Sequence, residues 1–329
     1  MALARRPILV APDSFKGTLD AATVAAAIAR GLRSAGWACD LAPLADGGEG
    51  TGPVLTARLG GEERGALARD PLGRERPVRF ALLGDGRTAI VEVAAASGLD
   101  SVGPRERDAE AATSAGTGEL IVAAIAAGAG EVLVAAGGSA TTDGGKGAIE
   151  AIESAGGLGE ARLTVLCDVR TPFELAATRF GPQKGADAAA VGRLRVRLQQ
   201  FASELPRDPR GVPMSGAAGG LAGGLWAAFG ARLAPGAPFV LDAIGFDRRL
   251  RASHAVIVGE GRLDVTTLEG KAVAEAATRA RQLGVPAHAI VAINALDRFD
   301  ARILDLQTIR EAGEPALIER TAAALAAEL

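Results

Sequence analysis

The sequence predicts an α/β protein with mostly parallel sheets. Apolar runs of four to six residues alternate along the chain with longer Ala-rich stretches, whose apolar residues recur at helical spacing. Loops rich in Gly join the two kinds of segment. An alternation of strand, loop and helix is typical of parallel sheets, because a parallel pair needs a crossover between its strands.

The predicted strands are short and apolar. The first covers residues 8–11, and its residues are apolar throughout, as in a strand buried on both faces. The remaining predicted strands cover residues 39–44, 88–93, 131–135, 163–166, 254–258 and 288–293.

The predicted helices begin with one that Asp20 caps and Gly36 ends. The clearest helix covers 187–204, where Val191, Leu194, Leu198, Phe201 and Leu205 fall on one face. Further helices are predicted at 117–128, 146–155, 270–283 and 314–328.

The length of 329 residues favours roughly two domains. Two segments rich in Pro, Arg and Gly, 58–79 and 205–213, are the best candidates for crossings between them. Gly is abundant at 44 residues and aromatic residues make up only 3%, so the cores must be built from closely packed Ala, Val, Leu and Ile.

The composition excludes several classes of protein. The net charge of −3 excludes a basic nucleic-acid-binding domain, so we expect no nucleic-acid partner. No apolar window is long enough to span a membrane, and no signal peptide is recognised at the start. The two cysteines, Cys39 and Cys167, lie in apolar runs, so we expect reduced thiols and a cytoplasmic location. A surface rich in Ala and Leu permits a homodimer without requiring one.

Five windows combine Gly with charged or hydroxyl residues, and each follows a predicted strand or opens a predicted helix. Free backbone N–H groups in such loops bind anions, and Gly lets the backbone approach closely. The alternative reading is that Gly only shapes tight turns. The windows are 11–17, 45–51, 137–145, 215–220 and 259–264.

Common phosphate and hydrolase motifs are absent. The segment ending at Gly145-Lys146 fails as a P-loop because Ala140 and Gly147 replace the required residues. The segment from Gly259 fails as a dinucleotide fingerprint because its sixth position is Asp264. With only His254 and His288 in the chain, a histidine-based triad is not expected.

Acidic residues gather where predicted strands end. In open α/β sheets, ligands bind outside the carboxyl ends of the strands, and carboxylates there can hold Mg²⁺ and accept a proton. Lysines accompany them and can offset phosphate charge, a mixture that phosphoryl transfer needs. Taken singly, Asp143 and Asp264 are better explained as caps or loop residues. The acids are Asp13, Asp46, Glu49, Asp143, Asp168, Glu260 and Asp264, and the lysines are Lys16, Lys184 and Lys271.

Nine stretches together resemble the bacterial glycerate kinases of the glycerate 2-kinase type. They run in order from near the N-terminus to residue 271, so the resemblance covers almost the whole chain. They are APDSFKGTL (11–19), ADGGEGT (45–51), EVAAASGL (92–99), TSAGTGELI (113–121), GGSATTDGG (137–145), CDV (167–169), FGPQKGA (180–186), GAAGGL (216–221) and VGEGRLDVTTLEGK (258–271).

The resemblance implies a cytosolic kinase that phosphorylates D-glycerate with ATP and Mg²⁺, giving 2-phosphoglycerate or 3-phosphoglycerate. It also implies two α/β domains with the site in the cleft between them. A restriction-endonuclease-like domain would comprise residues 1–59 and 251–329. A flavodoxin-like domain, residues 60–250, would be inserted into it.

The resemblance also implies roles for individual residues. The predicted catalytic residues are Asp13, Lys16, Asp46 and Asp168, with Asp46 and Asp168 as metal ligands and the general base unassigned among the three acids. The predicted substrate-binding residues are Ser14, Gln183, Lys184, Glu260 and Asp264. The predicted ATP-binding residues are Gly137, Gly138, Ser139, Thr141, Gly216, Gly219 and Gly220.

The chain departs from the family pattern at several positions, and it is also short between Ala151 and Leu163 and differs at 294–297. The family commonly has Tyr where Ala115 stands, and Asn where Thr142 and Thr171 stand. These changes spare the predicted acids and lysines but leave the substrate open. Two other functions therefore stay open: a kinase for another small hydroxy acid, and a nucleotide-binding regulator without catalysis.

Overall fold

The computed structural model describes residues 5–329, and contacts within the chain divide it into two compact units. Unit 1 comprises the described residues up to Asp46 together with Ala237–Leu329, and unit 2 comprises Gly47–Gly236. The predicted borders, 59/60 and 250/251, lie later along the chain than these. The expected absence of a signal peptide concerns in part residues 1–4, which lie outside the described part.

Unit 1 is built on a five-stranded parallel sheet in the order β13-β11-β9-β1-β2. Its strand β1, between β9 and β2, is buried along its whole length, which explains the unbroken apolar run from Ile8. The strands are β1 (Ile8–Pro12), β2 (Cys39–Leu41), β9 (Ala255–Gly259), β11 (Ala287–Val291) and β13 (Leu306–Glu311).

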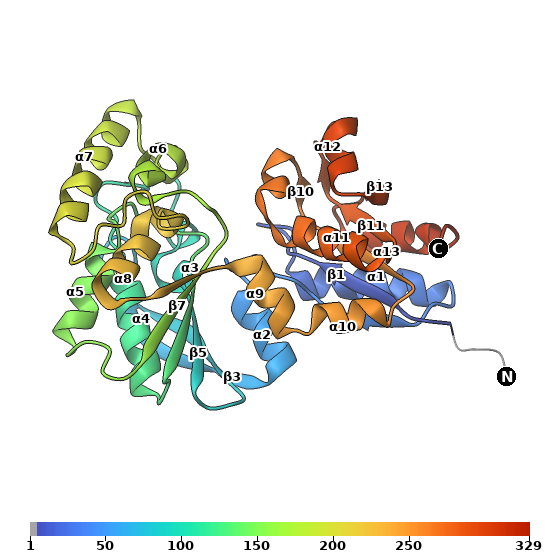
Figure 1. Ribbon diagram of the computed structural model, residues 1–329, viewed down its shortest axis with the longest axis horizontal. Helices are drawn as coiled ribbons and strands as arrows, with labels where there is room; N and C mark the ends of the chain where they lie inside the picture. Colours follow the sequence, from blue (N-terminus) through green and yellow to red (C-terminus); the bar gives the residue numbers. More distant parts are fainter. Residues whose placement is uncertain (1–4) are drawn as a thin grey trace. The chain divides into compact units, whose positions relative to one another are not determined.

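The first and last helices of unit 1, α1 (Ala21–Ser34) and α13 (Pro315–Leu325), pack against each other (Figure 1). Asp20 caps α1, since its side chain accepts the Thr23 N–H at 2.6 Å. Gly31 is required in α1, because a Cβ there would lie 2.1 Å from the Glu319 carbonyl oxygen of α13. The other helical elements and the small pair of strands are α9 (Gly236–Ala243), α10 (Phe246–Arg251), β10 (Arg262–Leu263), η5 (Val265–Glu269), α11 (Ala272–Leu283), β12 (Ile293–Asn294) and α12 (Arg298–Ile303).

Unit 2 is built on a six-stranded sheet in the order β3-β4-β5-β6-β7-β8. The first three strands pair antiparallel and the remaining pairs are parallel. The hairpin of β3 and β4 occupies most of 58–79, which the sequence analysis interpreted as a crossing between domains. The strands are β3 (Gly61–Arg69), β4 (Glu75–Leu83), β5 (Thr88–Glu92), β6 (Glu131–Ala135), β7 (Arg162–Cys167) and β8 (Arg232–Pro235).

The helices of unit 2 include α7 (Ala188–Glu204), the helix that the apolar spacing predicted most clearly (Figure 1). Asp187 caps it by accepting the Ala190 N–H at 2.7 Å, and Leu194 and Leu198 on its predicted apolar face are buried. The other helices are α2 (Thr51–Leu59), α3 (Val93–Ser97), α4 (Ala115–Ala126), α5 (Lys146–Ser154), α6 (Ala176–Phe180) and α8 (Leu221–Phe229), with the 3₁₀ turns η1 (Leu99–Ser101), η2 (Phe173–Leu175), η3 (Pro182–Lys184) and η4 (Ala217–Gly220).

The predicted fold class, α/β with mostly parallel sheets, is confirmed. One finer expectation needs correction. Numbered in their own chain order, the strands of unit 1 lie in the order 2-1-3-4-5, which is typical of flavodoxin-like sheets. The flavodoxin-like order therefore belongs to the unit made from both chain ends, because β1 pairs with β2 on one side and with β9 on the other.

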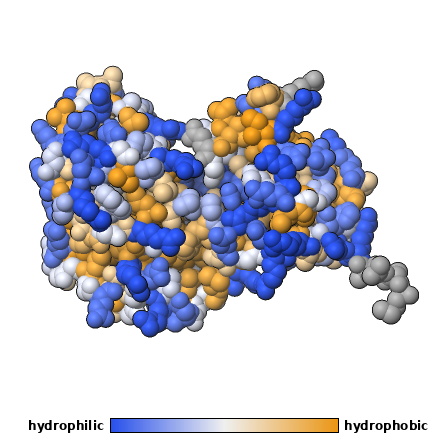
Figure 2. Space-filling model, in the orientation of Figure 1, coloured by the Kyte–Doolittle hydropathy of each residue, from blue (hydrophilic) through white to orange (hydrophobic). Residues whose placement is uncertain are grey.

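The surface of unit 1 carries apolar side chains near one end of its sheet. Val265, Ile293, Phe299 and Ile303 are all exposed, and Figure 2 shows apolar surface where Figure 1 places β10 and α12. Within residues 5–329, no helix combines the length and the apolar character that crossing a membrane requires.

Candidate functional site

Three buried carboxylates lie beyond the carboxyl ends of neighbouring strands in unit 1. Asp13 follows β1, and its N–H donates to the Gly259 carbonyl at the end of β9 at 2.7 Å. Glu260 comes next after β9, and Asp46 follows the segment that continues from β2. The three residues are only 6%, 7% and 3% exposed, respectively. We call Asp13, Asp46 and Glu260 the acidic cluster.

The acidic cluster places like charges close together in a poorly hydrated environment. Burial, followed by the Asp46 carboxylate, raises the pKa of Asp13 to about 8, although Lys16 and the Ser14 N–H act in the opposite direction. The Ser14 N–H donates to Asp13 Oδ1 at 2.6 Å, and Lys16 Nζ lies 3.3 Å from Asp46 Oδ2. A carboxyl group with this pKa can exchange a proton near neutral pH.

Glu260 is the second member of the acidic cluster with a shifted pKa. Burial raises its pKa to about 7, against a hydrogen bond from Thr267 Oγ1 to Oε1 at 2.8 Å and the nearby Lys271 ammonium. Lys271 Nζ lies 3.9 Å from Glu260 Oε2. Asp264 has a different environment: it caps η5, and a hydrogen bond from Thr266 lowers its pKa. The structure thus shows Asp264 as a helix cap, as its position in the sequence suggested.

A pocket of about 170 Å³ lies in unit 2, beyond the carboxyl ends of β6 and β7. Six segments contribute to it: η1, the loop after β6, the loop after β7, α6, η3 and η4. The lining residues are Leu99, Ala136, Gly137, Gly138, Ser139, Asp168, Val169, Phe180, Gln183, Lys184, Ala218 and Gly219. We call it the lysine pocket.

Lys184 is the buried cation of the lysine pocket, with 2% of its surface exposed. Its Nζ donates to Ser139 Oγ at 2.8 Å and to the Thr141 carbonyl at 2.6 Å. Burial lowers the pKa of Lys184 to about 7, although the carboxylates of Asp143 and Asp168 favour its charged form. A bound anion would raise this pKa again, so the pocket is suited to a negatively charged ligand.

Asp143 fixes the loop that carries Ser139 and Thr141. Its Oδ2 accepts the Ser114 N–H and hydroxyl at 2.8 and 2.7 Å and the Gly147 N–H at 3.2 Å, and its Oδ1 accepts the Gly145 N–H at 3.1 Å. Ser114 Oγ in turn accepts the Ala148 N–H at 3.0 Å. Asp143 therefore joins this loop to the N-terminal ends of α4 and α5, which agrees with its interpretation as a structural loop residue.

The segment 216–220 approaches the same loop closely. Ala218, Gly219 and Gly220 all have positive φ, at 52°, 68° and 92°. A Cβ on Gly219 would lie 1.9 Å from the Thr141 carbonyl oxygen, so only Gly fits there. Ala218, by contrast, has a Cβ in a conformation that costs about 1 kcal/mol, and strain of this kind is common at functional sites.

The structure brings the predicted site residues together in two sets. In unit 1, Asp13, Asp46 and Glu260 form the acidic cluster, while Ser14, Lys16 and Asp264 lie close by in the chain. In unit 2, the lysine pocket is lined by Gly137, Gly138, Ser139, Asp168, Gln183, Lys184 and Gly219. The predicted nucleotide residues Thr141, Gly216 and Gly220 lie in the same loops but do not line it.

Several residues of the lysine pocket had no place among the predicted site residues. Ala218 lies within the quoted GAAGGL stretch, but a positive φ at Ala cannot be recognised from sequence. Phe180 and Leu99 add large apolar side chains to the lining. The hydroxyl groups of Thr141, Thr142 and Thr171 are buried without a hydrogen-bond partner among the described residues, so this region contains unsatisfied polar groups.

The fit to a metal ion depends on how many protein ligands the ion needs. Among residues 5–329, no three His, Cys, Asp or Glu side chains are grouped closely enough to form a complete metal site. Mg²⁺ in nucleotide enzymes takes one or two carboxylates, and substrate phosphates and water complete its shell. Asp46, in unit 1, and Asp168, directly after β7 in unit 2, each have oxygen donors of this chemistry.

Comparison with known proteins identifies similar sequences over nearly the whole chain. A sequence profile of the Glycerate kinase family matches residues 8–155 and 152–314. A glycerate kinase of Halalkalibacterium halodurans is 36% identical over 322 residues, which cover 86% of this chain and 84% of that protein. A glycerate 2-kinase of Escherichia coli is 36% identical over 301 residues, which cover 80% of this chain and 79% of that protein.

A solved structure is similar as well. The crystal structure of a protein assigned as glycerate kinase 2 of Salmonella typhimurium LT2 superposes with a TM-score of 0.82. The two sequences are 32% identical, and the match covers 98% of each chain.

Proposed function

The chain belongs to the glycerate kinase family, and we propose that it transfers the terminal phosphoryl group of ATP to a hydroxyl group of D-glycerate, with ADP as the second product. The observation that carries this proposal is the buried acidic cluster, which offers a carboxyl group of nearly neutral pKa beside a lysine. In the reaction, the terminal P–O bond of ATP breaks, a new P–O bond forms to glycerate, and the hydroxyl proton must leave.

We propose that Asp13 is the general base that accepts the proton of the glycerate hydroxyl group. General bases work best when their pKa lies near the operating pH, and the pKa of Asp13 is raised to about 8. Its ionised form accepts the proton as the new P–O bond forms. Glu260 and Asp264 are proposed to hold substrate hydroxyl groups, and Ser14 and Lys16 to hold the carboxylate or the transferred phosphoryl group.

We propose that the lysine pocket binds the phosphate groups of the nucleotide. Lys184 supplies a buried positive charge, while Gly137, Gly138 and Gly219 leave the backbone accessible to an oxyanion. Thr141, Gly216 and Gly220 are proposed to support the same loops, and Ser139 and Gln183 to add hydrogen bonds. Asp46 and Asp168 are each proposed as ligands of Mg²⁺, which would offset phosphate charge when bound.

The experiment that tests the proposal is release of ADP from Mg-ATP with D-glycerate, with L-glycerate or with no acceptor. We expect release that depends on D-glycerate, and phosphorus NMR of the product will distinguish 2-phosphoglycerate, which we propose, from 3-phosphoglycerate. Stimulation only by another hydroxy acid would support the altered-acceptor kinase. Binding of ATP without turnover with any acceptor would support the non-catalytic regulator.

Single variants test the role of each acid. Asp13→Asn, Asp46→Asn and Asp168→Asn each keep the size of the side chain and remove its charge. Loss of the base should lower kcat by about 10²-fold or more with little change in KM. Asp85→Asn, in an exposed turn between β4 and β5, is the matched control and should keep full activity. Full activity in all three site variants would refute the assignment.

The cellular location and the oligomeric state of the protein stay proposals. Both cysteines, Cys39 and Cys167, are free thiols, which supports the proposed reducing cytoplasmic location. Homodimer formation stays a prediction, and the mass of the purified protein in solution will test it.

A further inference from the structure

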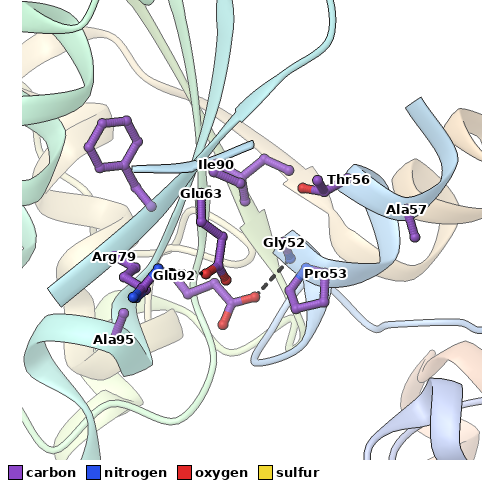
Figure 3. A pocket seen from close by; sticks show the side chains of 11 residues that line it. Gly52, Pro53, Thr56, Ala57, Glu63, Arg79, Ile90, Glu92 and Ala95 are labelled. Atoms are coloured by element: carbon purple, nitrogen blue, oxygen red, sulfur yellow. Dashed lines mark hydrogen bonds and ion pairs between the residues drawn. The ribbon is translucent and has the colours of Figure 1, made fainter. Parts of the chain in front are cut away.

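A second pocket of unit 2, of about 420 Å³, contains none of the residues assigned above (Figure 3). Helix α2 and the strands β3, β4 and β5 supply most of its wall, and α3 supplies the rest. The lining residues are Gly52, Pro53, Thr56, Ala57, Glu63, Arg79, Phe80, Ala81, Ile90, Glu92 and Ala95. We call it the α2 pocket.

Glu92 is the main polar group of the α2 pocket. Its Oε1 accepts the N–H groups of Gly50 and Gly52 at 3.1 and 2.8 Å, so the carboxylate holds the start of α2. Within the described part of the chain, its Oε2 accepts no hydrogen bond. Burial raises the pKa of Glu92, and the nearby carboxylates of Glu49 and Glu63 act in the same direction. The site thus holds a partly desolvated acid that lacks a cationic partner.

Thr56 provides a second unsatisfied polar atom. Its Oγ1 is buried and has no hydrogen-bond partner among the described residues. In Figure 3 this hydroxyl points from α2 towards the side of the pocket where Ile90 lies. A buried hydroxyl without a partner is costly, so a ligand that forms a hydrogen bond with it would gain affinity.

The charges around the pocket favour a cation over an anion. Glu63 and Glu92 lie close together in Figure 3, and Arg79 forms an ion pair with Glu63 at 3.1 Å. Among the described residues, the guanidinium that lines the pocket therefore pairs with Glu63 and not with Glu92. The rest of the wall is largely apolar and includes Pro53, Ala57 and Ile90.

We propose that the α2 pocket binds a small organic ammonium ion with a short hydrocarbon part. The ammonium group donates hydrogen bonds to the Glu92 carboxylate, and the hydrocarbon part contacts Pro53, Ala57 and Ile90. The Thr56 hydroxyl accepts a further N–H. An anion of the same shape is repelled by Glu92, because Arg79 is already paired with Glu63, and a neutral molecule leaves the charge of Glu92 without compensation.

Three probes with one carbon skeleton test this proposal: isobutylammonium, isobutanol and isobutyrate. The amide signals of Gly50 and Gly52, followed by two-dimensional ¹⁵N–¹H NMR of the full chain, report on the hydrogen bonds to Glu92. We expect isobutylammonium to shift these signals and to bind about tenfold more tightly than isobutanol. Isobutyrate should leave the signals unchanged.

Two variants and a control locate the binding. Glu92→Gln should weaken binding of isobutylammonium about tenfold, and Ala57→Phe, which fills the pocket and keeps Glu92, should abolish it. Glu150→Gln, at an exposed position of α5, should bind as the unmodified protein does. Equal shifts with all three probes, or unchanged affinity in a folded Glu92→Gln protein, would overturn the proposal. If Glu92→Gln does not fold, binding by Ala57→Phe as tight as in the unmodified protein would overturn it.

Discussion

Replacing Lys184 with methionine should remove a measurable pH dependence from the stability of the protein. Lys184 has a folded-state pKa of about 7, well below its unfolded value of about 10.4. Between these two values the unfolded chain binds one proton more than the folded chain at this residue. Stability must therefore rise with pH in this window, and it is lowest below pH 7, where the buried lysine is charged.

The size of the effect follows from proton linkage. Each pH unit within the window contributes up to about 1.4 kcal/mol, and incomplete titration at the lower end reduces this slightly. From pH 7.5 to 9.5, the unmodified protein should gain about 2.5 kcal/mol relative to Lys184→Met. The hydrogen bonds that the methionine loses, to Ser139 and Thr141, shift the stability by an amount independent of pH, so they do not affect this difference.

Urea unfolding at several pH values in this range measures the difference directly. Lys146→Met, which removes an exposed lysine at the start of α5, is the matched control and should follow the unmodified protein. Parallel curves for the unmodified protein and Lys184→Met would refute the reasoning, because they would mean that Lys184 keeps its proton in the folded state. The same reasoning predicts proton uptake when an anion binds in the lysine pocket at pH 8, measurable by titration calorimetry in buffers of different ionisation enthalpy.

Three further predictions concern the loops of the lysine pocket. Asp143→Ala should lower the free energy of unfolding by about 3 kcal/mol, because its carboxylate accepts four hydrogen bonds, and a loss below about 1 kcal/mol in urea unfolding would contradict this role. Ala218→Gly should raise stability by about 1 kcal/mol by relieving its positive φ, and a decrease would show that the Ala methyl group contributes more than its strain costs. Gly219→Ala should lower the melting temperature far more than Gly17→Ala, since both have positive φ but only Gly219 contacts the Thr141 carbonyl; equal decreases would exclude a steric cause.

Much of the architecture could be predicted because burial leaves a simple signal in the sequence. The apolar runs at β1, β6 and β9 are buried on both faces, so their residues are apolar without alternation. The hairpin of β3 and β4 left no such signal. β3 lies at the edge of its sheet and carries exposed charged residues, as edge strands often do, and the same residues are typical of a linker.

The sequence indicated candidate residues for the site, but it did not indicate that they form two groups, the acidic cluster in unit 1 and the lysine pocket in unit 2. Strand ends mark where ligands bind in open sheets, and this rule selected seven acids, of which Asp13, Asp46 and Glu260 form the acidic cluster. The burial of Lys184 could not be foreseen, because Pro182 and Gly185 beside it are equally typical of an exposed turn. The orphaned hydroxyls of the threonines near the lysine pocket depend on packing between segments distant in sequence, which no local pattern encodes.

The division of unit 1 between the two chain ends fixes an order of events during biosynthesis. All strands of unit 2 lie in one continuous segment, so its core can close as soon as that segment has left the ribosome. The strand β1 and the helix α1 are made before unit 2, yet their partners β9 and α13 are made after it. The apolar residues of β1 and α1 are therefore buried only after the whole of unit 2 has been made, and in the meantime they are exposed to aggregation unless transient contacts or chaperones cover them.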